Sequence, residues 1–531
     1  MTSNSPPPEL DVLIVGAGFA GLYALHKLRG QGLHVHVVEA GDGIGGTWHW
    51  NRYPGARCDV ESLYYSYSFD DDLQQKWEWS ERYATQPEIL RYVQHVAERF
   101  DLMRDIELQT KVESAHWDDA GDRWRVRVDR GVEYDTRFLL MATGCLSSRN
   151  RPDFPGLDDF AGDCFHTGEW PQEEPDLSGD RVGIIGTGSS GIQAIPPLAE
   201  RAKHLTVFQR TANYTVPANN HPLAPETVRE VKADYPRFRK MGNGFGPILE
   251  PNMQSAVQTS PEERERELEA RWTRGGLGFL TSFIDLLFNP DSNEIACDFV
   301  RDKIRNAVDD PEVAEILSPH VVFGCKRPCI DTGYFETFNR PNVTLVDVSK
   351  EPIERISEHG VVVAGREHPI DTLVLATGFD AMTGTLLKID IRGRDGRTLQ
   401  DKWQAGPRTF LGLQTEGFPN LFTITGPGSP SVLSNMLNAI EQHVDWIADC
   451  LQSMRQQGKT RIEAELDAEN AWVEHTNEIA QQTLYWNCNS WYLGANIPGK
   501  PRVFMPYIGM PTYQEKLDQV LDGGYEGFAL R

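Results

Sequence analysis

Two glycine-rich loops constrain this chain more than any other feature of its sequence. The first, GAGFAG at residues 16–21, follows the apolar run DVLIV, and the second, GTGSSG at residues 186–191, follows RVGII; each precedes a helical pattern. Such a loop between a strand and a helix lets the backbone approach a pyrophosphate at the positive end of the helix. The sequence therefore predicts two dinucleotide-binding units. The loop residues expected to contact cofactor are Gly16, Gly18 and Gly21 in the first unit and Gly186, Thr187, Gly188, Ser189, Ser190 and Gly191 in the second.

The residues that follow the second strand of each unit differ in charge. The strand HVHVV of the first unit is followed by Glu39, whereas LTVFQ of the second is followed by Arg210 and Thr211. A carboxylate at this place accepts hydrogen bonds from the ribose hydroxyls, and a guanidinium binds a ribose 2′-phosphate. We therefore expect FAD at the first site and NADPH, in preference to NADH, at the second.

The two units share a further pattern. Hairpin-like segments at 123–135 and 360–371 lead into strands that end in Ala-Thr-Gly, FLLMATG at 138–144 and TLVLATGFD at 372–380. Between the units, residues 221 to about 325 are mainly helical in pattern and highly charged, with a capping box at 260–263. We expect the charges of this insertion to face water.

These patterns predict an α/β fold with two Rossmann-like dinucleotide-binding domains, for FAD and NADPH, and a helical insertion. Residues 1–150 would form the first part of the FAD-binding domain, and residues 380–531 its second part. Residues 151–379 would form the NADPH-binding domain, with the insertion at about 221–325.

Composition excludes several other classes of function. The formal net charge is −25, without a long run of Lys or Arg, which argues against nucleic acid or an anionic membrane surface as a partner. None of the eight cysteines forms a CxxC pair, and Cys325 and Cys329 do not supply the redox pair of a flavin disulfide reductase. The segment MTSNSPPPEL has no basic region followed by an apolar stretch, so we expect no secretory leader, and the sequence contains no run of 18 consecutive apolar residues. We expect a cytoplasmic protein with reduced thiols, a disordered first few residues and no metal.

Three further segments carry residue types suited to chemistry. Residues 41–69 combine glycines and aromatic residues, which suits a flavin ring, although an aromatic core cluster is the alternative. Asp59 in this segment is either a surface turn acid or a partner for a buried cation. Lys326 and Arg327 follow VVFG, which we expect to be a strand, and paired basic residues are more often solvated than functional.

The third segment, FAGDCFHTGEWP at 160–171, has no regular periodicity and lies just before the second loop. It matches the fingerprint FxGxxxHxxxW of the Baeyer-Villiger monooxygenases at Phe160, Gly162, His166 and Trp170. The chain also resembles this flavoprotein family, and its phenylacetone and steroid monooxygenase branch most closely, in GGTW, NRYPGARCD, FQRT, KRP, GPGSPSVLSNM and SWYLGANIPGKPRVFMPY. One departure is His49, where the resemblance leads us to expect tyrosine.

The resemblance implies NADPH- and O2-dependent oxidation of ketones to esters or lactones through a flavin C4a-peroxide. It implies that Arg327 is catalytic and that Asp59 positions it. Lys326, Arg210 and Thr211 would hold the NADPH 2′-phosphate, and Trp491 would close over the nicotinamide nucleotide. It makes 160–171 an interdomain connector in which His166 has a conformational role rather than that of a general base. Further FAD contacts are expected at Gly46, Thr47, Trp48, Asp59, Tyr65, Val112 and Met436.

The expected partners are molecular oxygen and a small apolar ketone, and the expected state is a monomer or weak oligomer. Val432, Leu433 and Met436 would line a pocket for aryl, cyclic or bulky ketones, although a plain Gly/Ser/Pro loop is the alternative. The main competing function is that of an N- or S-oxygenating flavin monooxygenase. A binding or scaffold protein without enzymatic activity would have little use for two dinucleotide sites of opposite ribose chemistry.

Overall fold

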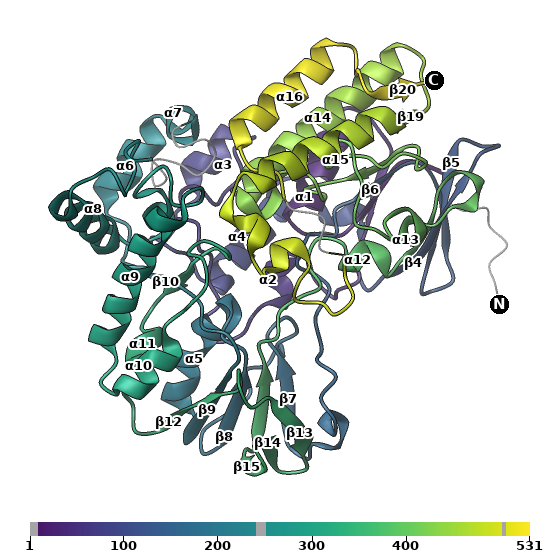
Figure 1. Cartoon of the computed structure of the whole chain (residues 1–531). Coiled ribbons are helices and arrows are strands. Elements are labelled where there is room, and N and C mark those ends of the chain that lie inside the picture. The colour runs from purple at the N-terminus through teal and green to yellow at the C-terminus, as the bar shows by residue number, and fades with distance from the viewer. Residues whose placement is uncertain (1–8, 241–250, 502–505) are drawn as a thin grey trace.

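The fold is built on two separate sheets. The computed structural model describes residues 9–240, 251–501 and 506–531. In Figure 1 the larger sheet lies at the right, the smaller at the bottom and the insertion helices at the left. The predicted disorder of the first few residues, and part of the motif at 490–507, lie outside the described residues.

The larger sheet combines strands from the two ends of the chain. Its β1 (Glu9–Val15) lies parallel to β2 (Val35–Val38) and β6 (Glu133–Met141), and the predicted hairpin at 123–135 is the antiparallel pair of β5 (Arg123–Val128) and β6. The helix α1 (Phe19–Gly30) begins directly after the first loop and packs against α14 (Met436–Gln456). The order is β17 (Asp390–Arg392), β4 (Val112–Asp118), β5 (Arg123–Val128), β6 (Glu133–Met141), β1 (Glu9–Val15), β2 (Val35–Val38) and β3 (Ile106–Glu107), with β18 (Leu421–Thr423) also paired to β6.

The smaller sheet is entirely parallel and holds the second loop. Its order is β12 (Val343–Asp347), β9 (His204–Gln209), β8 (Arg181–Ile185), β16 (Thr372–Leu375) and β7 (Asp163–His166). The helix α5 (Ser189–Arg201) follows the loop. The second predicted hairpin belongs to a separate antiparallel sheet of β13 (Ile353–Ser357), β14 (Gly360–Val363) and β15 (Arg366–Pro369). The predicted α/β class with two dinucleotide-binding units and a helical insertion is confirmed.

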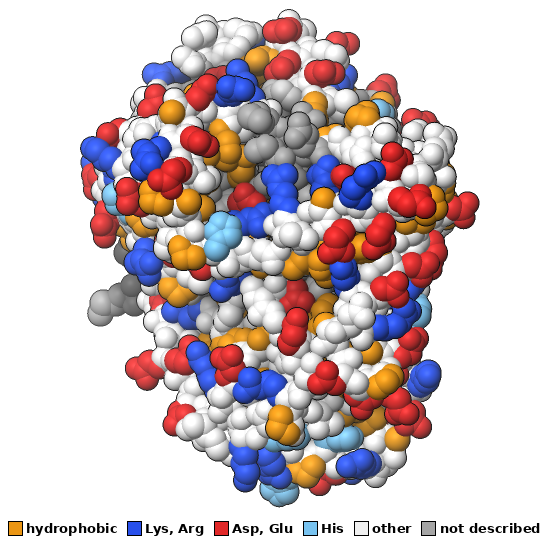
Figure 2. All heavy atoms as spheres, turned by 90° about the vertical axis from the view of Figure 1, so that its left-hand side faces the viewer, with side chains coloured by type: hydrophobic (Ala, Val, Ile, Leu, Met, Phe, Trp, Pro, Cys, Tyr) orange, Lys and Arg blue, Asp and Glu red, His pale blue; other side chains and the backbone are white. Residues whose placement is uncertain are grey.

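The insertion is helical, as predicted, and most of its charges face water, but Arg301 is buried and donates hydrogen bonds to Glu294, Asp298 and the Pro319 carbonyl. Ser260 caps α8 by accepting a hydrogen bond from the Glu263 N–H, and Leu268 is the buried residue of this helix. Acidic and basic side chains are interspersed on this face of the molecule (Figure 2). The helices are α6 (Pro225–Ala233), α7 (Tyr235–Lys240), α8 (Pro261–Arg274), α9 (Pro290–Ala307) and α10 (Pro311–Leu317).

One local prediction was wrong, and the segment at 160–171 has more regular structure than its sequence pattern indicates. The segment VVFG before Lys326 is not a strand but a turn, because the Asn293 side chain satisfies the backbone of Phe323 through its amide nitrogen and its oxygen. The segment at 160–171 is more than a connector, because Asp163–His166 forms the edge strand β7. This strand pairs in parallel with β16, which lies far away in the sequence.

The remaining elements complete the layers around the two sheets. They are α2 (Thr47–Trp50), α3 (Asp71–Lys76), α4 (Gln86–Arg99), β10 (Thr215–Pro217), β11 (Cys329–Asp331), α11 (Tyr334–Thr337), α12 (Gly384–Leu387), α13 (Leu399–Lys402), β19 (Ile462–Ala464), α15 (Leu466–Gln481), α16 (Met510–Asp522) and β20 (Phe528–Leu530). Among the helices of the described residues, none has the length and apolar character required to cross a lipid bilayer.

Candidate active site

The first glycine loop has a backbone that requires glycine. Gly16 has a φ of 108°, and a Cβ there would lie 2.6 Å from the carbonyl oxygen of Ala142. A Cβ on Gly21 would overlap the carbonyl oxygen of Gly16. Gly18 caps α1 without a side-chain hydrogen bond, so the first N–H groups of this helix suit a phosphate. The loop therefore fits a dinucleotide pyrophosphate.

Glu39 is held beside this loop by the backbone. Its side chain is buried, and its carboxylate accepts hydrogen bonds from the N–H groups of Ala17 at 2.7 Å and Gly41 at 2.8 Å. Each carboxylate oxygen has a second lone pair, so the anchored group can also accept from ribose hydroxyls. The carboxylate is thus fixed at the place where the sequence analysis expects the ribose.

The aromatic residues near the loop form one connected cluster. Trp48 donates a hydrogen bond from Nε1 to the Tyr65 hydroxyl at 3.0 Å, and the rings of Tyr65 and Phe19 make a T-shaped contact. Phe19 also contacts Tyr67, which is fully buried in the core against Tyr92, as the alternative interpretation of this segment expects. The segment is therefore part of the core, and Tyr65 packs against that core.

The other expected FAD residues lie in different surroundings. Gly46 has a φ of 54° and begins α2 opposite Gly18, with Thr47 as the first helical residue. The side chain of Val112 packs in a separate core cluster with Val15 and Val38. His49, the departure from the family pattern, is buried, and its Nε2 lies 2.9 Å from the Asp42 carboxylate.

The second glycine loop repeats the geometry of the first but is more open. Gly186 has a φ of 109°, and a Cβ on Gly188 would meet no atom within 4 Å. The exposed Arg210 and Thr211 follow β9. Thr187 donates a hydrogen bond from Oγ1 to the Thr211 carbonyl at 3.1 Å, which joins the loop to the end of β9.

Lys326 lies close to Arg210, although the two are far apart in sequence. Burial, and in smaller part the positive charge of Arg210, lowers the pKa of Lys326. Its Nζ donates to Asn213 Oδ1 at 3.4 Å, and Asn213 Nδ2 donates to the Thr187 carbonyl at 2.5 Å. Sequence reasoning missed Asn213, whose place just after Thr211 was the only indication. The two cations form a site suited to a phosphate dianion.

Arg327 and Asp59 form an ion pair between the two units. Arg327 Nη2 lies 2.7 Å from Asp59 Oδ2, and Nη1 donates to the Val432 carbonyl at 3.5 Å. Burial acts against the charged guanidinium, but the Asp59 carboxylate outweighs it, and the pKa of Arg327 is raised. The guanidinium therefore remains a fixed cation. Asp59 is thus the partner of a half-buried cation rather than a surface turn acid.

Tyr492 is a second residue that sequence reasoning missed. Its hydroxyl accepts a hydrogen bond from the Arg327 backbone N–H at 3.3 Å. Burial raises the pKa of Tyr492 to about 12, so the phenol keeps its proton near neutrality. Its place beside Trp491 in the motif SWYLGANIPGK was the available indication.

Apolar residues gather beside this pair. Val432 and Tyr492 belong to one buried cluster, against which Leu433, Met436 and Trp491 pack. The segment at 429–436 is thus not a plain exposed loop, since Ser431–Leu433 forms a helical turn within this cluster. The residues expected to line the substrate pocket therefore lie together with Trp491, which is expected to close over the nicotinamide nucleotide.

The fingerprint residues brace the smaller sheet. His166 Nδ1 accepts a hydrogen bond from the Gly168 N–H at 2.9 Å, and Nε2 lies 3.3 Å from Thr377 Oγ1. Burial and, to a smaller extent, the charge of Arg149 lower the pKa of His166 to about 4, so the imidazole is neutral near pH 7. A Cβ on Gly162 would overlap the Asp371 carbonyl oxygen. Trp170 packs against Phe165, and Phe160 against the core cluster around β13 to β15.

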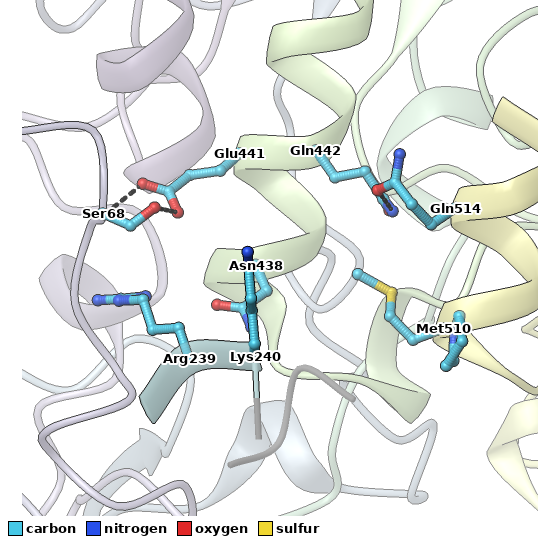
Figure 3. A pocket seen from close by; sticks show the side chains of 9 residues that line it. Ser68, Arg239, Lys240, Asn438, Glu441, Gln442, Met510 and Gln514 are labelled. Atoms are coloured by element: carbon cyan, nitrogen blue, oxygen red, sulfur yellow. Dashed lines mark hydrogen bonds between the residues drawn. The ribbon is translucent and has the colours of Figure 1, made fainter. Parts of the chain in front are cut away.

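Two surface cavities lie away from these residues. One, of about 390 Å³, lies between α7, α14 and α16, where the buried Glu441 accepts hydrogen bonds from the backbone and hydroxyl of Ser68 (Figure 3). The other, of about 410 Å³, lies beside Trp272 and Asp331. Neither is lined by the residues expected to bind cofactor.

Comparisons with known proteins identify the family. A Baeyer-Villiger monooxygenase of Pseudooceanicola batsensis is 45% identical over 527 residues, which cover 97% of this chain and 95% of that protein. The chain belongs to the Baeyer-Villiger monooxygenases. The pyridine nucleotide-disulphide oxidoreductase family also matches, over residues 13–241.

Two further relatives show the range of this monooxygenase family. The solved structure of an oxidized steroid monooxygenase bound to NADP superposes with a TM-score of 0.94, at 52% identity, and covers 98% of this chain and 99% of that one. The phenazine N-monooxygenase PhzNO1 of Lysobacter antibioticus is 41% identical, and the match covers 98% of this chain and 97% of that protein. The expected resemblance to Baeyer-Villiger monooxygenases is thus confirmed over nearly the whole chain.

Proposed function

We propose that this chain is an FAD-containing monooxygenase that uses NADPH and O2 to convert ketones into esters or lactones. The observation that carries the proposal is the Arg327–Asp59 pair at 2.7 Å, which joins the segment after the first dinucleotide loop to the one beside the second. FAD and NADP are bound in solved relatives of this family. The two loops and the opposite charges of Glu39 and Arg210 support one cofactor of each kind here.

FAD, when bound with NADPH as the reductant, would provide the means of activating O2 so that one oxygen atom can be transferred to the substrate. The oxidation of a ketone places negative charge on the attacking oxygen and then on the former carbonyl oxygen. A fixed cation stabilises such charge without donating a proton to it. Arg327 suits this role because its pKa is raised, and Asp59 holds the guanidinium in place. His166 is a positioning residue, since its hydrogen bonds fix the ends of β7 and β16.

Cofactor contacts are assigned on the same basis. We assign FAD to Gly16, Gly18, Gly21, Glu39, Gly46, Thr47, Trp48, Asp59, Tyr65 and Met436, and to the backbone of Val112. NADPH is assigned to the residues of the second loop from 186 to 191 and to Arg210, Thr211, Lys326 and Trp491. Asn213 joins this set because it links Lys326 to the loop.

The substrate is a small apolar ketone of the aryl, cyclic or bulky class. Val432, Leu433 and Met436 support this assignment because they place apolar surface beside Arg327. We also propose the domain boundaries given above, a cytoplasmic location and a monomer or weak oligomer. The absence of CxxC pairs supports the cytoplasmic location, and the net charge of −25 supports a monomer or weak oligomer because copies of the chain repel one another.

The test is oxygen-dependent NADPH oxidation by the purified yellow protein, with phenylacetone and a panel of cyclic ketones under isotopically labelled dioxygen. We expect ketone-stimulated turnover and one labelled oxygen in each ester or lactone. Arg327→Ala should retain FAD but form no ester, whereas Arg340→Ala, at an exposed arginine, should behave as the unaltered enzyme. NADPH consumption that yields only hydrogen peroxide with every ketone would overturn the proposal.

N-oxygenation is the second candidate, and the phenazine N-monooxygenase relative favours including it. An oxygen transferred to a nitrogen requires a protonated, electrophilic oxygen donor, which a fixed guanidinium does not supply. Phenazine and a thioether therefore belong in the same panel. A labelled N-oxide formed faster than any ester would make this the main activity.

A further inference from the structure

A histidine and a tyrosine are buried together behind the substrate segment, the name used here for residues 426–436. His443 lies on α14 and Tyr513 on α16, and both side chains are fully buried. His443 Nε2 lies 2.7 Å from the Tyr513 hydroxyl. The proposed function assigns neither residue a role.

The backbone fixes the direction of each hydrogen bond of this pair. The Thr425 N–H donates to His443 Nδ1 at 3.0 Å, so this nitrogen carries no proton. The Leu411 carbonyl can only accept, so the Tyr513 hydroxyl donates to it, at 2.5 Å. Burial lowers the pKa of His443 to about 3, so the imidazole is neutral near pH 7. Its one proton is therefore on Nε2 and is donated to the Tyr513 oxygen.

The two backbone groups held by the pair belong to residues in an unfavourable conformation. Leu411 has a φ of 58° and Thr425 a φ of 54°, in the left-handed region that side chains larger than a hydrogen atom rarely adopt. Such a conformation is costly, above all for a β-branched residue such as threonine, and it persists only where surrounding contacts impose it. The pair supplies one such contact to each of the two residues.

The pair reaches the substrate segment from two sides. On the first side, Thr425 directly precedes the segment and His443 lies about two turns into the helix that follows it, so their hydrogen bond closes the segment at its base. On the second side, the turn at Leu411 and Gly412 packs against the segment, since a Cβ on Gly412 would lie 2.6 Å from the Cβ of Ser429. The position of the segment therefore depends on both contacts.

The substrate segment contacts the arginine of the proposed active site. The Val432 carbonyl accepts a hydrogen bond from Arg327 Nη1 at 3.5 Å, and Val432 and Met436 belong to the apolar surface beside it. A backbone rotation at Thr425 would displace this carbonyl and this apolar surface together, because both follow Thr425 in the chain.

We propose that His443 and Tyr513 are positioning residues that hold Leu411 and Thr425 in the left-handed conformation and so place the substrate segment against Arg327. This inference rests on the proposed function, because it takes the segment to bind the ketone. The pair should act on the ketone and not on NADPH, since the second glycine loop belongs to the smaller sheet.

Hydrogen exchange followed by mass spectrometry tests the structural part of the proposal. Tyr513→Phe keeps the ring but removes the hydroxyl at the centre of the pair. We expect peptides from 411–436 to exchange about tenfold faster in the flavin-loaded variant. Tyr23→Phe is the matched control, because the buried Tyr23 hydroxyl donates to Asp445 on the same helix α14 at 2.7 Å. Unchanged exchange in Tyr513→Phe would overturn the proposal.

Steady-state kinetics, expressed per bound flavin, test the effect on the substrate. We expect KM for the ketone to rise by about tenfold in Tyr513→Phe while KM for NADPH stays the same. A purely structural role would lower the yield of flavin-loaded protein without changing the KM for the ketone, and that result would overturn the positioning role. Absence of ester from the unaltered enzyme would instead count against the proposed function, and hydrogen exchange, which needs no ketone, would still decide whether the pair holds the segment.

A second substitution isolates the backbone conformation from a general loss of packing. Thr425→Gly introduces a residue that adopts a positive φ without steric cost. In the Tyr513→Phe background it should restore part of the affinity for the ketone, whereas Thr425→Ala should not. If glycine gives no recovery, the pair does not act through the conformation of Thr425.

The two members of the pair should also behave as one unit. His443→Asn keeps an acceptor for the Thr425 N–H but loses the contact with Tyr513, so its ketone KM should match that of Tyr513→Phe. The double variant should then be no worse than either single variant. Effects that multiply in the double variant would show that the two residues act separately.

Discussion

The two dinucleotide loops have nearly the same backbone but different surroundings. Gly16 and Gly186 have φ values of 108° and 109°, and Gly18 and Gly188 cap their helices at the same φ of −80°. In both loops a Cβ on the last glycine would overlap the carbonyl oxygen of the first. The backbone therefore specifies a pyrophosphate but does not distinguish the two cofactors.

The side chains around the loops make the distinction. Glu39 is buried, and both its oxygens are tied to the backbone of its own loop. Arg210 is exposed, and the nearby Lys326 is held through a single asparagine. A prearranged, enclosed partner suits a cofactor that stays bound, whereas an open cationic site suits one that exchanges. This comparison indicates that the residence time of each cofactor depends on how firmly the protein holds the side chain that binds its ribose.

Alanine substitution of the last glycine in each loop should give the largest effect. We expect Gly21→Ala to lose FAD and on the order of 3 kcal/mol of unfolding free energy, because the new Cβ overlaps backbone. Gly191→Ala should keep FAD and lose NADP+ affinity. Absorbance of bound flavin and NADP+ titration measure both. Gly30→Ala is the control, since its Cβ would meet no atom within 4 Å. Loss of flavin from Gly191→Ala would contradict the independence of the two sites.

The ion pair between the units should give the next largest effect. Asp59→Asn keeps the shape of the side chain but removes the charge that holds Arg327, and we expect kcat to fall by about 10²–10³-fold. NADP+ affinity should not change, because the second glycine loop is not altered, and kcat is to be expressed per bound flavin because Asp59 is also an assigned FAD contact. Steady-state kinetics with a ketone give the measurement. Asp72→Asn, in an exposed ion pair, is the control. Unchanged kcat would remove Asp59 from the mechanism.

The cationic site should show a smaller and selective effect. Arg210→Gln and Lys326→Gln each remove one charge-assisted hydrogen bond to the 2′-phosphate, so KM for NADPH should rise by roughly 10- to 100-fold. KM for NADH, which lacks that phosphate, should change little. Arg201→Gln, at the exposed end of α5, is the matched control. An equal rise in both KM values would assign these residues to another part of the nucleotide.

The smallest expected effect is on how the free energy of unfolding depends on pH. The group concerned is His166, whose Nε2 lies beside Thr377 in the Ala-Thr-Gly segment that follows β16. The pKa of His166 is lowered to about 4, so the unfolded chain binds more protons between about pH 4 and 6.5, and unfolding becomes easier as the pH falls through this range. From pH 7 to 5 this group should remove about 2 kcal/mol of unfolding free energy.

His166→Asn keeps an acceptor for the Gly168 N–H but does not titrate. Denaturant unfolding at several pH values should therefore show a weaker dependence on pH for this variant. The same substitution at the exposed His359 is the control. If the free energy of unfolding depends on pH as steeply in His166→Asn as in the unaltered protein, His166 is not the group responsible.

Local patterns were predictable from sequence, and long-range pairings were not. The glycine loops, the hairpin of β5 and β6 and the cap of α8 follow from neighbouring residues, whose conformations the sequence constrains directly. The edge strand β7 depends on pairing with β16, and the turn at VVFG depends on Asn293, so neither has a local pattern. The Arg327–Asp59 pair was expected only from the family resemblance. The contacts of Asn213 and Tyr492 required the fold.

The larger sheet receives its last strands from a late part of the chain, and this fixes the order in which the two sheets can be completed during synthesis. The strand β18 pairs with β6, and β17 pairs with β4, so the sheet that begins at Glu9 is finished only after residue 423 has been made. The strands of the other sheet, β7, β8, β9, β12 and β16, all lie within residues 163–375. On the ribosome, the second dinucleotide unit can therefore close while the first still waits for its last strands. A nascent chain halted before β17 should bind NADP+ without retaining flavin.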